Sequence, residues 1–183
     1  MGDYEQALRR IVHQCASGYV YTRRTQTIHD LAMRALGFTF NARHTCHQRI
    51  VDRLGDTEAQ ARVVKWFAHE QQREKAFYKE NPEAIPADWI QSQRLSTEQA
   101  LERILVVCET SKAFGRTIQA VHDLAMHALG MTASQRAQSY SQCLDVQRST
   151  VQRLVDRTGI RGATYQLKGQ GIVLWDNPEY QPS

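Results

Sequence analysis

The sequence predicts a mainly α-helical protein made of two similar helical lobes in tandem, with the second lobe ending in a β-hairpin. Residues 5–39 and 98–132 repeat one another without a gap, with 18 identities over 35 positions. Unrelated sequences of this length would share about two or three identities, so the repeat marks an internal duplication. The only clear β-hairpin pattern is the alternating stretch 163–167, followed by a glycine-containing turn at 168–171 and the β-rich run 172–175.

Each copy of the repeat predicts two helices. Apolar residues recur at helical spacing over 5–14 and again over 97–107. A second helix is expected over 25–36, and its twin over 118–129. A glycine follows the second helix of each copy, where a left-handed residue commonly ends a helix; these two glycines are Gly37 and Gly130.

A third helix is expected in each copy, over 42–54 and over 146–158. The block 48–53 resembles the block 152–157, but the two are 104 positions apart instead of 93. This pattern indicates 11 extra residues in the second copy, around the polar stretch 134–145. An insertion of this kind belongs in a loop or an extended helix end.

Residues 57–79 predict a long helix that only the first half contains. The segment 81–89 has two prolines and an acidic bias, which is typical of a linker. Trp89 and Ile90 are expected to anchor it to a lobe. The predicted domains are therefore a first lobe over 1–80, a linker over 81–96 and a second lobe over 97–183.

Composition limits the class of protein. The chain has 183 residues, 42% of them hydrophobic, and a net charge of +4, which is compatible with nucleic-acid binding. No apolar run approaches the roughly 18 residues of a membrane span, and the four cysteines match neither a zinc knuckle nor a small disulfide scaffold. We expect a cytoplasmic protein with reduced thiols, nucleoid-associated in a bacterium or nuclear in a eukaryote, with no membrane partner.

The order helix, turn, helix and hairpin over residues 98–175 resembles the winged helix-turn-helix superfamily. The stretch between Gly130 and Val146 is longer than the usual turn of that superfamily. The resemblance implies two tandem helix-turn-helix-like lobes, the second with a C-terminal β-hairpin wing. It also implies that the second helix of the motif enters the major groove of DNA, while the wing lies over the backbone.

Charge follows the repeated lobes. Residues 1–55 carry a net charge of +4, residues 56–96 carry −1, and residues 147–170 carry +4. Arginine and glutamine suit base edges, and basic side chains suit phosphates. We therefore predict double-stranded DNA as the partner of a transcription regulator or of a recognition module in DNA processing. The predicted DNA-binding residues are Arg148, Ser149, Gln152, Arg153, Arg157, Arg161 and Lys168 in the second lobe, with Arg43, Gln48, Arg49 and Arg53 in the first.

Two other functions fit parts of the sequence. A protein-interaction adaptor would use the aromatic residues Trp66, Phe67, Trp89 and Trp175 as a docking surface. A DNA-acting enzyme would need a site that leaves no sequence motif, and we expect no catalytic residue, metal ion or cofactor. The pairs His29–Asp30 and His122–Asp123 point about 100° apart on a helix, so their side chains do not converge on one metal ion.

Overall fold

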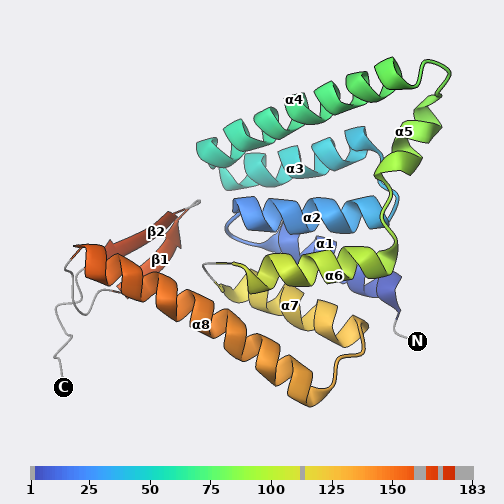
Figure 1. Cartoon of the computed structure of the whole chain (residues 1–183). Coiled ribbons are helices and arrows are strands. Elements are labelled where there is room, and N and C mark those ends of the chain that lie inside the picture. The colour runs from blue at the N-terminus through green and yellow to red at the C-terminus, as the bar shows by residue number, and fades with distance from the viewer. Residues whose placement is uncertain (1–2, 112–113, 159–163, 169–170, 176–183) are drawn as a thin grey trace, which may run out of the picture.

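The structure is a computed structural model that describes residues 3–111, 114–158, 164–168 and 171–175, with side chains described as far as Arg148. Four helices form its centre (Figure 1). Helix α1 packs against both α2 and α7, and α6 packs against the same two helices. The first and second copies of the repeat therefore contribute two helices each; the four are α1 (Tyr4–Ser17), α2 (Arg23–Ala35), α6 (Thr97–Glu109) and α7 (Arg116–Ala128).

One apolar core joins the two copies. In each first helix, the residues three or four positions apart face inward, because that spacing places them on one side of a helix. The same cluster contains matched residues of both copies, so the main core is shared between them. The fully or almost fully buried pairs are Leu8 with Leu101, Ile11 with Ile104, Cys15 with Cys108, and Ile28 with Val121.

Side chains define where these helices begin. The side chain of Asp3 accepts a hydrogen bond from the amide of Gln6 at the start of α1. Ser96 and Gln99 form a reciprocal capping box at the start of α6. Gly37 and Gly130 have φ of 77° and 69° after the second helices, which confirms the predicted left-handed ends.

Helices α3 (Phe40–Leu54) and α4 (Thr57–Glu80) form a hairpin that lies outside α2 (Figure 1). Gly55 ends α3 with φ of 63°, and Asp56 caps α4 directly afterwards, so the turn between them is short. A second, smaller core joins this hairpin to Tyr21, in the segment before α2. The predicted linker contains a further helix, α5 (Pro86–Gln93), and Trp89 is buried as expected whereas Ile90 is 38% exposed.

Helix α8 (Ala133–Thr158) is continuous, so the stretch 134–145 is helical. Thr132 accepts a hydrogen bond from the amide of Gln135, as Thr39 does from Ala42 at the start of α3. The offset of 93 therefore continues into the third helix. Because α8 has 26 residues and α3 has 15, the 11 extra residues lie at the C-terminal end of α8. The block 152–157 lies in that extension, and its match to the block 48–53 of α3 does not mark equivalent positions.

The predicted fold class of two tandem helix-turn-helix-like lobes, the second winged, is wrong. The described chain is helical from α1 to α8, and α1, α2, α6 and α7 share one core instead of forming two lobes. The predicted recognition helix 146–158 is the distal half of α8, which runs away from the bundle (Figure 1). Beyond it, β1 (Thr164–Lys168) and β2 (Gly171–Trp175) pair with each other, but the described residues contain no separate helix-turn-helix lobe to which this hairpin could belong as a wing.

A change in the second copy should reduce the stability of the first. Ile104→Ala removes a fully buried side chain from the shared core, and we expect a loss of about 2–5 kcal/mol in the free energy of unfolding. Amide hydrogen exchange should show reduced protection in α1 and α2 as well as in α6. The exposed Val106→Ala on the same helix is the control, and unchanged protection in α1 and α2 would mean that the copies fold separately.

Candidate functional site

A buried polar cluster connects α2, α3 and the segment before α2. The hydroxyl oxygen of Tyr21 lies 2.8 Å from Nδ1 of His29 and 2.5 Å from Nδ1 of His47. All three side chains are almost completely buried. Burial lowers the pKa of His29 to about 3 and also lowers the pKa of His47, so both imidazoles are neutral at pH 7.

The tautomers of the two histidines follow from this geometry. Nε2 of His47 lies 3.7 Å from Oδ1 of Asp30, which is too long for a hydrogen bond, but the nearby carboxylate favours a proton there and we assign the proton of His47 to Nε2. Nδ1 of His47 then accepts the single hydroxyl proton of Tyr21, and Nδ1–H of His29 donates to the hydroxyl oxygen. Nε2 of His29 is left as a buried acceptor without a partner.

Two carboxylates hold the helices together next to this cluster. Asp30 pairs with Arg43 of α3 and, at 2.9 Å, with Arg34 of its own helix. Glu70 of α4 pairs with Arg34 at 3.0 Å and with Arg73 at 2.6 Å. Burial alone would raise the pKa of Asp30, but His47 and the two arginines hold it below its ordinary value. The charges are mutually satisfied, so this network stabilises the attachment of α3 and α4 to α2.

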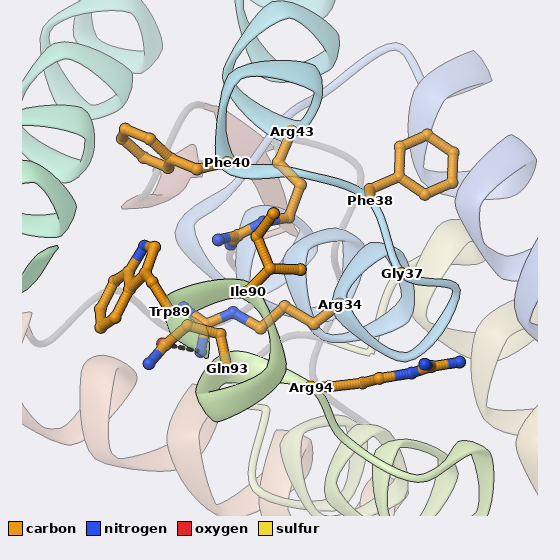
Figure 2. A pocket seen from close by; sticks show the side chains of 9 residues that line it. All are labelled: Arg34, Gly37, Phe38, Phe40, Arg43, Trp89, Ile90, Gln93 and Arg94. Carbon is orange, nitrogen blue, oxygen red and sulfur yellow. Dashed lines mark hydrogen bonds between the residues drawn. The ribbon is translucent and has the colours of Figure 1, made fainter. Parts of the chain in front are cut away.

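A small pocket lies between this network and α5 (Figure 2). Its volume is about 20 Å³, which is enough for a single water molecule. Arg34 and Arg43 line it, but their guanidinium groups already pair with Asp30 and Glu70. The pocket is therefore too small to hold a ligand larger than a water molecule, although a third arginine, Arg94, also lines it.

The second copy has the same cluster with different chemistry. Phe114 and Tyr140 occupy the positions that correspond to Tyr21 and His47, and both rings pack against His122, the counterpart of His29. Nε2–H of His122 donates to Oγ of Ser139 at 2.9 Å, and that hydroxyl donates to Glu109 at 2.5 Å. Burial lowers the pKa of His122, so this imidazole is also neutral.

Neither cluster has the geometry of a metal centre or of an active site. Within the described residues, no group of three or more histidine, cysteine, aspartate or glutamate side chains could hold a metal ion. Burial raises the pKa of Cys143, beside His122, to about 11, so its thiol is not activated as a nucleophile. The imidazoles in both copies are buried and have no open face toward a substrate.

An open groove lies between α1 and α7, where the first copy meets the second. Its volume is about 720 Å³, within the range of ligand-binding clefts. Of its nine lining residues, two are arginines, two are histidines and one is an acid. They are Gln6, Arg9, Arg10, His13 and Gln14 on α1, and Ala120, Asp123, Leu124 and His127 on α7.

The arginines of this groove are available to a ligand. Arg9 and Glu5 form an ion pair at 2.6 Å, but both side chains are more than half exposed, so the pair is weak. Arg10 is exposed, and no ion pair or hydrogen bond engages it in the described part of the chain. The guanidinium of Arg10 is therefore accessible, and the nine lining residues carry a formal net charge of +1, from Arg9, Arg10 and Asp123 with the histidines taken as neutral.

The equivalent surface of the other helix pair, α6 with α2, differs. Glu102 replaces Arg9, Val106 replaces His13 and Val107 replaces Gln14 at the offset of 93. Arg103 is kept at the position of Arg10. At these three positions α6 therefore has one acid and two valines where α1 has an arginine, a histidine and a glutamine.

Several residues predicted to contact DNA make contacts within the protein. Arg43 is buried in its ion pair with Asp30, which removes it from the surface. Arg53 donates to the carbonyl oxygens of Ala16 and Gly18 at 2.7 and 2.8 Å, and this joins α3 to the end of α1. Gln48 donates to Asp52, while Arg49 and Arg148 are exposed. The side chains of Ser149, Gln152, Arg153, Arg157, Arg161 and Lys168 lie outside the described residues.

The aromatic residues predicted as a docking surface largely pack within the protein. Phe67 stacks on Phe40 with ring centroids 4.8 Å apart, and Trp66 packs edge-on against His47. Trp89 is buried against Phe77. The side chain of Trp175 lies outside the described residues. The α1–α7 groove was not predicted, although the replacement of Arg9 and His13 in the second copy is visible in the aligned repeats.

No protein-family model, curated protein or solved structure matches the chain. Each described helix is too short or too polar to cross a membrane.

Acid should destabilise the protein through His29. The unfolded chain binds a proton at His29 near pH 6.5, whereas the folded chain does so only near pH 3. The folded-state pKa is the lower one, so stability falls as pH drops below about 6.5. Urea unfolding should show a loss of about 2–3 kcal/mol from this group between pH 7 and pH 4.5. His29→Gln should make the free energy of unfolding depend less on pH. If it falls equally with pH in the variant and in the wild type, the lowered pKa of His29 does not cause the loss of stability.

Tyr21→Phe should show how much the buried hydroxyl contributes. The change leaves Nδ1 of both His29 and His47 buried without a partner, and we expect a loss of about 1–3 kcal/mol. Tyr19→Phe is the control, because Tyr19 precedes the same helix but is 92% exposed. If thermal unfolding shifts equally in both variants, the hydroxyl does not stabilise the cluster.

Proposed function

We propose that this protein binds DNA and that backbone phosphates contact the basic side chains of the α1–α7 groove. The observation that supports the proposal most strongly is the composition of that groove, with Arg9, Arg10, His13 and His127 facing one open space. Exposed arginines bind phosphates because a guanidinium offers several donors in a planar fork. Such contacts fix the position of a protein on DNA and supply most of its salt-dependent affinity.

The distribution of charge favours an anionic partner at this surface. Asp30 and Glu70 neutralise buried arginines on the far side of α2, so those groups contribute little charge to the exterior. Asp123 is the only acid in the groove. Exposed Arg23, Arg24 and Arg49 add positive charge on other helices. The roles expected for such binding, in transcription regulation or in recognition during DNA processing, stay predictions.

A gel-shift experiment with salt tests this function. Full-length protein should bind a random-sequence duplex at 50 mM salt, and the affinity should fall as the salt concentration rises. Arg10→Gln should weaken binding and make the plot of log affinity against log salt shallower by about 0.9, the slope that one phosphate contact contributes.

Arg103→Gln is the matched control, because it removes the same charge from the equivalent position of α6. We expect it to leave the salt dependence nearly unchanged. The proposal fails if no binding is detected at low salt, if affinity does not depend on salt, or if the two arginine variants weaken binding equally.

A further inference from the structure

The width of the α1–α7 groove limits what can enter it. Packed helices have axes about 8–10 Å apart, so the trough between two neighbouring helices is narrow. The major groove of duplex DNA alone is about 12 Å wide, and a whole duplex is wider than the trough. The volume of about 720 Å³ is nevertheless large enough for a nucleotide-sized ligand. A duplex can therefore touch the rim, whereas only an unpaired nucleotide can enter.

The lining of the groove has separate parts that suit a phosphate and a base. The basic side chains of Arg9, Arg10 and His13 all lie on α1. On α7, Ala120 and Leu124 give an apolar surface against which the flat face of a base can lie. Asp123, on the same wall, is the single acid. A carboxylate weakens binding of a plain polyanion, so its presence here points to a ligand that also carries a hydrogen-bond donor.

We propose that the α1–α7 groove binds an unpaired nucleotide of a DNA strand and that Asp123 accepts a hydrogen bond from the amino group of its base. This inference rests on the proposed function, because the phosphates of the strand remain on the arginines of α1. The Watson–Crick edge of a base is free only where the strand is unpaired. Cytosine presents an amino donor that a carboxylate accepts, whereas thymine presents a carbonyl oxygen that a carboxylate repels.

The equivalent surface between α6 and α2 supports the assignment by what it lacks. The surface of α6 has Glu102 and Val106 at the positions of Arg9 and His13, so it repels phosphate and offers it fewer donors. Asp30, the counterpart of Asp123, is buried in ion pairs with Arg34 and Arg43. The protein thus has one groove of this kind within its described part, at the junction of α1 with α7.

Fluorescence anisotropy of full-length protein with labelled 12-nucleotide strands at pH 7.5 tests this site. The wild-type protein should bind an all-cytosine strand at least about fivefold more tightly than an all-thymine strand, the discrimination expected of one base contact. It should also bind the cytosine strand more tightly than a 12-base-pair duplex. Asp123→Asn should bring the ratio of the two affinities close to one, because an amide can both donate and accept.

The loss of the negative charge and the loss of the base contact change the two affinities in different ways. Asp123→Asn removes a negative charge, so both strands should bind more tightly even as their ratio falls. Glu102→Gln on α6 makes the same charge change outside the groove and should leave the ratio unchanged. Asp123 and Glu102 are both exposed, so both variants should fold like the wild type.

The outcomes separate this inference from the proposed function. If Asp123→Asn tightens both strands equally and keeps the ratio, Asp123 acts only through charge and the inference is wrong. If the wild-type protein binds both strands and the duplex equally, the groove does not read an unpaired base, although DNA binding stands. If it binds no DNA at low salt, the proposed function fails as well.

Discussion

The packing of α1 against α7 and of α6 against α2 is the constraint on which the rest of the structure depends. Helices α1 and α2 alone would leave one side of their apolar faces exposed, and so would α6 and α7. Each pair is covered by the other, which buries matched residues such as Leu8 and Leu101. Because burial of apolar surface drives folding, the duplication is a requirement of the fold and not a sign of two independent modules.

The shared core left the outer surfaces free to diverge. In the first copy, Asp30 ties α2 to α3 through Arg43, and Arg34 ties α2 to α4 through Glu70. In the second copy, the corresponding Asp123 and His127 are exposed along the groove with α1. Helix α4 thus covers in one copy the positions that are exposed in the other copy. The same division appears in the buried clusters, where Tyr21 hydrogen-bonds to histidines but Phe114 only packs.

The sequence predicts the helices better than it predicts their assembly. Apolar spacing and the glycines at 37 and 130 locate the helices of both copies, because these signals are local. The apolar face of a helix does not specify whether helices of the same copy or of the other copy pack against it. The sequence therefore predicted two lobes, whereas the structure has one shared core. The similarity between the blocks 48–53 and 152–157 aligned α3 with the wrong part of α8. The groove joins α1 to α7, more than 100 positions apart, and no local pattern predicts such a junction.

An NMR titration of the full-length protein with a short cytosine strand tests the central claim most directly. The amide signals of α1 and α7 around Arg10, His13, Asp123 and His127 should shift together as the strand is added. The equivalent signals of α6 and α2, around Arg103 and Val106, should stay in place. Shifts confined to α3 and α8, or equal shifts on the two equivalent surfaces, would contradict the account, because binding would then not depend on the groove where the two copies meet.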